Sequence, residues 1–188
     1  MNDYEFTLTF SLPASSLPAS SLPASGGNPE AYLDALFEAG CDDAVIGIGG
    51  VGSIALDYGR QAESAASAVQ GAIAQVQLAI PGSEFLELKP DLVGITDIAE
   101  LANCSRQNIR KFVTDSKALF PQPSVSGSVP LWHFYEVANW LINNSRVKSK
   151  PHPESIEISK IAFEINIAAQ RKRFKRSIAE AKADYTPK

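Results

Sequence analysis

Residues 95–141 constrain the fold more than any other stretch, because their apolar residues follow a helical spacing twice before proline and glycine interrupt it. The first helix is expected to begin with Thr96 as its cap. It should stop at about Asn103, a residue that tolerates the left-handed backbone of a tight turn. Ser105 can cap a second helix over 105–115. The buried face of this second helix is expected to be Ile109, Phe112 and Val113.

A short β-hairpin is expected after the helix pair. Residues 120–123 read FPQP and cannot continue a helix, because proline lacks the amide that a helix needs. Strand-like residues on both sides of Ser126-Gly127-Ser128 predict a hairpin, or wing, over 124–132. One more amphipathic helix then closes the small core, and its apolar residues are Tyr135, Val137, Ala138, Trp140 and Leu141.

The exposed face of the second helix is cationic and rich in hydrogen-bond donors. The major groove of DNA admits one helix, and arginine and glutamine are suited to reading base edges there, whereas lysine suits the phosphates. The expected contacts to double-stranded DNA are Ser105, Arg106, Gln107, Arg110, Lys111, Thr114 and Lys117. Of these, Arg106, Gln107 and Arg110 are expected to read bases, and the two lysines to bind phosphate. The alternative is an ordinary helical hairpin with a solvated basic face.

In order and spacing, residues 95–141 resemble the winged helix-turn-helix of the MerR superfamily, in particular its excisionase-like and AlpA-like branch. The resemblance is carried by Ile95 to Ala102, Ser105 to Arg110, Phe120 to Pro123, Gly127, Leu131-Trp132 and Glu136 to Leu141. It implies a DNA-binding module of a kind found in repressors, activators, excisionases and antitoxins. In that group an arginine often follows the wing glycine. Here Ser128, Val129 and Pro130 follow it, so no strong wing contact is implied.

The net charge of −4 hides two opposite halves. Residues 1–90 carry 11 acidic and 2 basic side chains, a balance of −9, and residues 91–188 carry 10 acidic and 15 basic ones, a balance of +5. Neutralisation of phosphate is local, so the second half is the one expected to meet DNA. The acidic half is expected to face away from DNA or toward a protein partner.

Residues 1–90 predict a β-α-β-β-α-β order, which is that of a ferredoxin-like α+β sandwich. The expected strands are 4–10, 44–48, 53–58 and 84–88. A first helix is expected to be capped by Asn28 and to end at Gly40, with an apolar stripe of Tyr32, Leu33, Leu36 and Phe37. A second is expected over 62–79, with Val69, Ile73, Val76 and Ile80 inward. Such domains often bind small effectors or pair with themselves, but a fold alone does not give a function.

Two segments of this half have unusual composition. Residues 11–25 repeat SLPAS three times, so 11–27 is expected to be a low-complexity surface loop that interrupts the domain. A partner-binding motif is the less favoured alternative. Residues 47–52 satisfy the dinucleotide-binding pattern G-x-G-x-x-G, but a strand is expected after them instead of a helix. A hairpin is therefore favoured over a nucleotide site, and no cofactor is expected.

The C-terminal region is expected to be a linker over 145–153 and a helix over 154–184. The helix carries a stripe of Ile158, Ile161, Ala162, Ile165, Ala168 and Ala169, which something must cover. A homodimer is favoured, since a helix after the DNA module commonly pairs in MerR-like proteins, and packing against its own chain is the alternative. The basic run 171–176 is expected either to contact phosphate or to be a solvated helix end.

Several classes are not expected. No run of about 18 apolar residues is present, so no membrane span is expected, and no secretory signal is evident. Two cysteines favour a reducing, cytoplasmic location, at the nucleoid when the protein is bound to DNA. His133 and His152 are not spaced as a metal pair, and His133 is expected to be a structural wing residue. No enzyme motif is found. The leading expectation is a transcriptional regulator, and the alternatives are an antitoxin-like or protein-interaction module and a small-ligand sensor.

Overall fold

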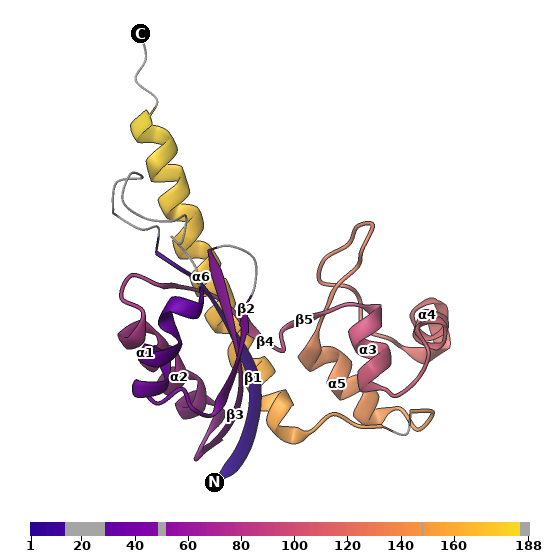
Figure 1. Cartoon of the computed structure of the whole chain (residues 1–188). Helices are drawn as coiled ribbons and strands as arrows, with labels where there is room; N and C mark the ends of the chain where they lie inside the picture. The colour runs from indigo at the N-terminus through magenta and orange to yellow at the C-terminus, as the bar shows by residue number, and fades with distance from the viewer. Residues whose placement is uncertain (14–28, 49–51, 148, 185–188) are drawn as a thin grey trace.

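The computed structural model describes residues 1–13, 29–48, 52–147 and 149–184. It contains two hydrophobic cores, which we assign to a sheet unit (residues 1–90) and a helical unit (residues 91–147). A long helix, α6 (Pro153–Asp184), contacts both cores. Figure 1 shows the two units side by side, with the end of α6 projecting beyond them. No helix in the described ranges has the length and apolar character needed to cross a membrane.

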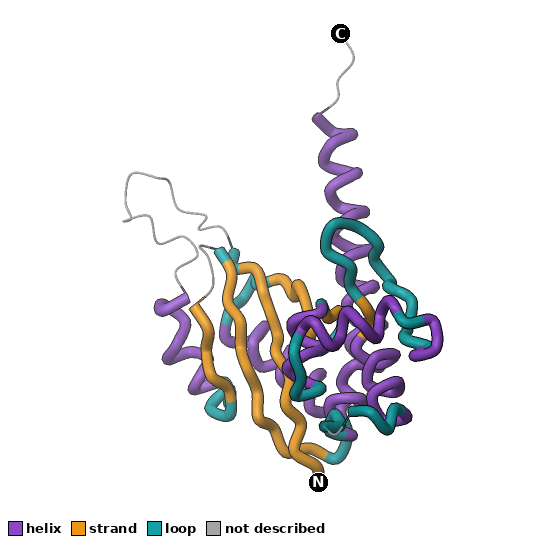
Figure 2. Tube along the Cα trace, turned by 90° about the vertical axis from the view of Figure 1, so that its right-hand side faces the viewer, coloured by secondary structure: helices purple, strands orange, loops and turns teal. Residues whose placement is uncertain are grey.

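The sheet unit is built on a four-stranded antiparallel sheet with the order β2-β3-β1-β4. Its strands are β1 (Asn2–Ser11), β2 (Ala44–Ile48), β3 (Ser53–Ala62) and β4 (Glu84–Lys89). The predicted strands are confirmed, although β3 runs further than expected. Alternate residues of the central strand β1 are buried, namely Tyr4, Phe6, Leu8 and Phe10, whereas Glu5 and Thr7 lie on the opposite, polar face. The strands lie side by side in Figure 2.

Two helices follow the strands as expected, but both differ in detail. Helix α2 (Ala65–Ala79) begins three residues later than predicted, because β3 continues to Ala62 and Ser64 caps the helix by accepting from the Ser67 amide. Val69, Val76 and Ile80 are fully buried and Ile73 is half-buried.

The predicted apolar stripe of the first helix is half confirmed, because Leu36 is buried in the core and Tyr32 packs against it, whereas Leu33 and Phe37 are exposed. A 3-10 turn, η1 (Pro29–Tyr32), leads into α1 (Leu33–Glu38), and of the stripe only Leu36 is fully buried. Phe37 is 69% exposed. A helix of six residues makes fewer than two turns, so it presents few positions to the sheet before it ends near Gly40, whose φ is +88°. Asn28, the predicted cap, lies outside the described residues.

The first half of α6 packs against its own chain. Ile158 and Ala162 are fully buried in the core of the sheet unit, and Ile161 and Ile165 pack against that core. The part of the stripe that favoured a dimer is thus covered by β4, β1 and α2. Ile156 packs against the core of the helical unit.

The helical unit closes around three aromatic side chains. Its elements are β5 (Leu92–Val93), α3 (Ile95–Leu101), α4 (Arg106–Thr114), the 3-10 turn η2 (Ser116–Ala118), β6 (Trp132–His133) and α5 (Phe134–Asn143). The ring of Phe120 lies 5.8 Å from Trp132 and 4.7 Å from Trp140, both in edge-on arrangements. Val147, in the segment predicted as a linker, is buried in the same core.

The predicted hairpin over 124–132 is only partly formed. A single bridge closes the loop, with amide-to-carbonyl distances of 3.1 and 3.0 Å between Val125 and Leu131. Trp132 instead pairs with Val93 of β5, and its indole donates to the Pro121 carbonyl at 3.0 Å. The burial of this indole draws residue 132 into the core, which leaves the wing as a loop.

A buried polar group joins the two units. Asn166 of α6 accepts from the Leu88 amide at 2.8 Å and donates both to the Leu88 carbonyl and, at 2.7 Å, to Asp91. The other carboxylate oxygen of Asp91 lies 3.1 Å from Nδ1 of His133, whose ring packs edge-on against Phe163. His133 is therefore a junction residue and does not belong to the wing.

Candidate nucleic-acid interface

The turn between α3 and α4 has the backbone that the sequence predicted. Asn103 adopts a φ of +47°, and the Cys104 amide donates to the Ala99 carbonyl at 2.9 Å, which closes the end of α3. The predicted cap of α3 is wrong. Thr96 lies within the first turn, and the side chain of Asp97 instead accepts from the Gly94 amide at 2.7 Å.

Helix α4 is anchored by its cap and by two apolar side chains. Ser105 accepts from the Asn108 amide at 3.2 Å, as predicted. Ile109 and Phe112 are buried in the core of the helical unit, and Val113 is half-buried against it. Phe112 also contacts Trp140 edge-on, with ring centres 5.2 Å apart. This packing holds α4 in one rotation about its axis, so the residues opposite Ile109 and Phe112 must face away from the core.

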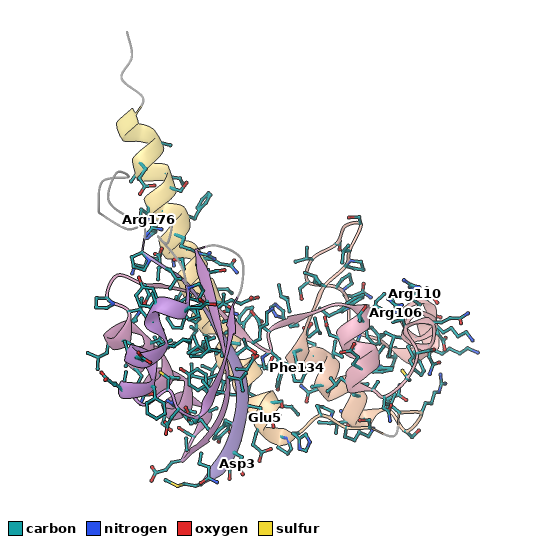
Figure 3. All side chains as sticks on the ribbon, viewed as in Figure 1. Asp3, Glu5, Arg106, Arg110, Phe134 and Arg176 are labelled. Carbon is teal, nitrogen blue, oxygen red and sulfur yellow. The ribbon has the colours of Figure 1, made fainter. Side chains whose placement is uncertain are left out.

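The opposite side of α4 is fully open to solvent. Its exposed members include five of the predicted DNA contacts, namely Arg106, Gln107, Arg110, Lys111 and Thr114. Figure 3 shows Arg106 and Arg110 on the flank of the helical unit that is turned away from the sheet unit. Within the described ranges, neither guanidinium has a salt bridge or a side-chain hydrogen bond. Both are therefore available to a ligand.

The remaining predicted contacts have different roles in the structure. The Thr114 hydroxyl lies 3.0 and 3.2 Å from the carbonyls of Arg110 and Lys111, so its proton is used within the helix. The Ser105 oxygen is used as a cap. Lys117 does not lie on α4 but in η2, where its amide donates to Asp115 and its side chain is exposed.

Arg146 is a further cation that the sequence did not single out. It lies 3.6 Å from Asp115, across the end of α5 from η2, and its side chain is mostly exposed. Lys117 and Arg146 line the same recess, although 29 positions separate them in the sequence. No local pattern places residue 146 there, because the proximity depends on how α5 packs.

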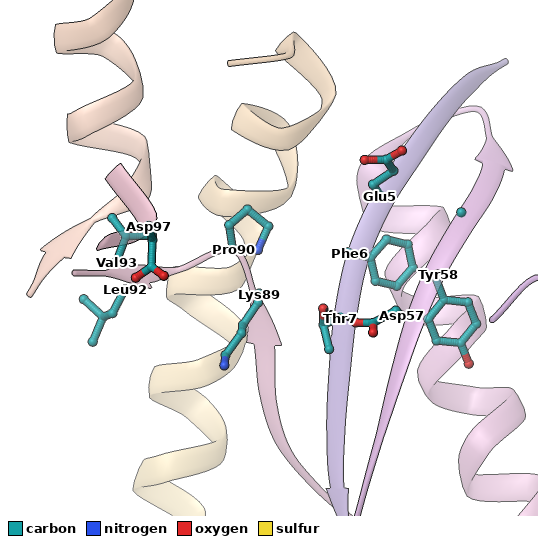
Figure 4. A pocket seen from close by; sticks show the side chains of 11 residues that line it. Glu5, Phe6, Thr7, Asp57, Tyr58, Lys89, Pro90, Leu92, Val93 and Asp97 are labelled. Atoms are coloured by element: carbon teal, nitrogen blue, oxygen red, sulfur yellow. Dashed lines mark hydrogen bonds between the residues drawn. The ribbon is translucent and has the colours of Figure 1, made fainter. Parts of the chain in front are cut away.

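A hollow beside the polar face of the sheet has the wrong charge for a phosphate backbone. This cleft, of about 550 Å³, lies between the polar face of the sheet and the start of α3 (Figure 4). It is lined by the carboxylates of Glu5, Asp57 and Asp97, with Lys89 as the one cation among the described lining residues. Asp57 accepts from the Thr7 hydroxyl at 2.6 Å. Carboxylates repel a polyanion, so the exposed face of α4 remains the candidate interface.

The basic run in α6 is partly used within the chain. Both terminal nitrogens of Arg176 lie 2.8 Å from the carboxylate oxygens of Glu84 on β4. This contact lowers the pKa of Glu84, and the charges of Lys172 and Arg173 lower it further. Arg171, Lys172 and Lys175 stay exposed. The run therefore both ties α6 to the sheet and leaves positive charge on its surface.

The other sequence candidates give no site in the described residues. Residues 49–51 of the G-x-G-x-x-G pattern and most of the SLPAS repeats lie outside them, but β2 and β3 pair as neighbours, from Ile48 opposite Ile54 to Ala44 opposite Tyr58. A strand thus follows the glycines. No cluster of three metal-ligating side chains is found in the part of the chain that the structure describes.

The candidate interface thus consists of one exposed cationic helix face on a rigid aromatic core, with two further cations beside its C-terminal end. Comparison of the chain with protein-family models, with curated proteins and with solved structures finds no match.

Proposed function

We propose that this chain is a sequence-specific DNA-binding protein, a transcriptional regulator that reads the major groove with the exposed face of α4. The observation that carries the proposal is the pair Arg106 and Arg110, exposed and without an ion pair among the described residues, on a helix whose other side is buried. Arginine can bind guanine through two hydrogen bonds, and Gln107 beside it suits adenine. Lys111 and Lys117 are assigned to phosphate.

The finer reading of the fold supports this proposal. The order β-α-β-β-α-β with an antiparallel β2-β3-β1-β4 sheet is what a ferredoxin-like sandwich requires. The α3–α4 pair, the loop closed by Val125 and Leu131, and α5 follow the order of the winged helix-turn-helix that residues 95–141 resemble. We therefore infer a DNA-reading module attached to a ferredoxin-like domain.

The proposal does not depend on a homodimer. Ile158 and Ala162, which favoured a dimer in the sequence, are buried against the same chain. One copy presents one α4, and a second copy would add a second half-site. Sedimentation velocity of the protein alone and with DNA distinguishes these two arrangements.

The test begins with selection of duplexes from a random-sequence library by the wild-type protein. Fluorescence anisotropy on the selected duplex then compares the wild type with Arg106→Ala/Arg110→Ala. The affinity of this variant is expected to fall about a hundredfold or more, because two base contacts are lost. The matched control, Arg171→Ala/Lys172→Ala, removes the same charge from α6 and should retain the preference for the selected duplex over a scrambled one.

Salt dependence provides a second readout. The affinity of the wild type should fall steeply as salt rises, because counterions are released from the phosphates. Equal binding by the wild type and the double arginine variant, or no enrichment of any sequence in the selection, contradicts the proposal.

A further inference from the structure

Leu119 combines two features that are each unfavourable for a leucine. Its side chain is 82% exposed, and its backbone is left-handed, with φ +48° and ψ +39°. Asn103 is the other non-glycine residue with a positive φ among the described residues, and asparagine tolerates that conformation. Leucine does not, since its Cβ crowds the carbonyl oxygen. Strain of this kind is often found at functional sites.

The conformation of Leu119 is imposed by its two neighbours. The indole of Trp140 donates to the Ala118 carbonyl at 2.7 Å. On the other side, Phe120 is buried between the rings of Trp132 and Trp140. Because the chain is held on both sides, the leucine side chain is presented to solvent from a fixed backbone.

The surroundings of Leu119 are polar and cationic. It lines a recess of about 320 Å³ together with Lys117, Arg146, Asn143 and Asn144. Of the described residues that line this recess, two are cations and none is a carboxylate, and Asp115, outside the lining, lies 3.6 Å from Arg146. An apolar partner protein would have to bury these charges, whereas a polyanion with an apolar sugar surface matches both the cations and the leucine.

The position of Leu119 relative to α4 also fits a nucleic acid. It follows the C-terminal end of α4 after the short turn η2, and Lys117 lies between them. The N-terminal residues of a recognition helix contact the base edges, so the residues beyond its C-terminal end lie near the sugar-phosphate backbone that borders the groove. The minor groove lies on the other side of that backbone.

We propose that Leu119 is an apolar DNA contact, which enters the minor groove beside the major-groove site of α4 while Lys117 and Arg146 bind the flanking phosphates. Apolar side chains that enter the minor groove are a known mode of DNA binding. This inference rests on the proposed function and adds a second groove to it.

The test uses Leu119→Gly and Leu119→Asn in the full chain, because glycine and asparagine both accept the left-handed backbone and preserve the fold. The control is Leu78→Ala, which removes a leucine that is 74% exposed on α2 of the sheet unit. The probe is the duplex that the wild type selects from a random-sequence library. Fluorescence anisotropy gives the affinity, and hydroxyl-radical cleavage gives the protected sugars.

Both Leu119 variants are expected to bind about tenfold more weakly and to lose protection of one minor-groove segment that flanks the α4 site. Leu78→Ala should match the wild type. Lys117→Ala and Arg146→Ala should each make the slope of log affinity against log salt concentration shallower by about one unit, because each removes one phosphate contact.

Three results would overturn the inference. The first is an affinity of both Leu119 variants for the duplex within about twofold of the wild-type affinity. The second is a pattern of protected sugars that does not change in these variants. The third is a wild type that sediments as a dimer and a Leu119→Asn variant that sediments as a monomer, because a second copy would then cover the leucine. If Arg106→Ala/Arg110→Ala abolishes binding while the Leu119 variants do not affect it, only this inference fails. If the wild type binds no duplex, the proposed function fails with it.

Discussion

Arg60 of the sheet unit and the two arginines on α4 of the helical unit are used in opposite ways. In the sheet unit, Nε of Arg60 lies 2.6 Å from Asp43, the side chain is mostly buried, and the guanidinium stacks over the ring of Tyr58. The hydrogen bond to Asp43 raises the pKa of Arg60. In the helical unit, Arg106 and Arg110 project into solvent with no ion pair in the described ranges. The charge of Arg60 therefore stabilises the fold, whereas the charges on α4 remain available for a ligand.

Cys41 and Tyr58, which lie near Arg60, stay in their neutral forms because they are buried. Burial raises the pKa of the Cys41 thiol and of the Tyr58 phenol, and the Tyr58 hydroxyl lies 3.4 Å from the Cys41 sulfur. Both groups stay protonated at neutral pH. These polar groups of the sheet unit thus bind one another inside the fold. The exposed groups that could bind a ligand lie on α4 of the helical unit.

The largest effect is expected where the two units meet. Asp91→Ala leaves the partly buried Nδ1 of His133 and one amide proton of the buried Asn166 without a partner, which should cost about 3 kcal/mol of unfolding free energy. Urea denaturation followed by circular dichroism measures it. Glu100→Ala, at an exposed position of α3, is the control. A loss below about 1 kcal/mol would show that the units are held together by other contacts.

The direct comparison of the two kinds of arginine comes next. Arg60→Ala leaves Asp43 partly buried without its partner and should lower the unfolding free energy by about 2 kcal/mol. Arg106→Ala should change it by less than about 0.5 kcal/mol, because the side chain makes no intramolecular contact of note. Urea titrations of both variants under the same conditions measure the two losses of unfolding free energy. Equal losses would show that Arg60 stabilises the fold no more than Arg106 does.

A smaller effect of opposite sign is expected at Leu119. Leu119→Gly relieves the left-handed backbone and should raise the unfolding free energy by about 1 kcal/mol. The same variant is expected to bind DNA more weakly, so stability and binding should change in opposite directions. Thermal unfolding of the protein without DNA measures the change in stability. A destabilised Leu119→Gly would show that the leucine supports the fold.

The smallest effect concerns the contact between α6 and the sheet. Arg176 lowers the pKa of Glu84 below its ordinary value of 4.5. A carboxyl with a lowered pKa in the folded state contributes stability above its ordinary pKa, and this contribution is lost as the pH falls through the lowered value. Glu84→Gln should therefore be less stable than the wild type at neutral pH, and the difference should vanish in acid. A difference that persists unchanged in acid contradicts the assignment.

Local patterns predicted the elements well. Alternation predicted the strand over 4–10, and local composition predicted the other three strands. The cap at Ser105 and the turn at Asn103 were both recognised from side-chain chemistry that acts within a few residues. One local prediction was wrong, because Asp97 and not Thr96 caps α3. The larger errors concern what a buried face packs against. The stripe of α6 was recognised as buried, but periodicity does not tell whether a second copy or the same chain covers it. Trp132 was assigned to a hairpin, because its tertiary contact with Phe120 is not visible in the local pattern.

Some residues of the candidate site could also be predicted from the sequence, and others could not. The exposure of Arg106, Gln107 and Arg110 follows from their position on α4 opposite Ile109 and Phe112, so the sequence was sufficient. Leu119 and Arg146 were missed. The backbone of residue 119 is set by the hydrogen bond from Trp140 and the burial of Phe120, and the position of residue 146 depends on the packing of α5. Neither leaves a local signal in the sequence.

The side chain of Asn166 has a consequence for how the chain avoids self-association. β4 is an edge strand, and such a strand offers unpaired amides and carbonyls to any other extended chain. Asn166 fills both backbone positions of Leu88, as one residue of an added strand would do. Because Asn166 lies 78 positions after Leu88, this part of the edge has no partner until that stretch of chain has been synthesised. A sheet unit without α6 is therefore expected to be more prone to aggregation through β4 than the full chain.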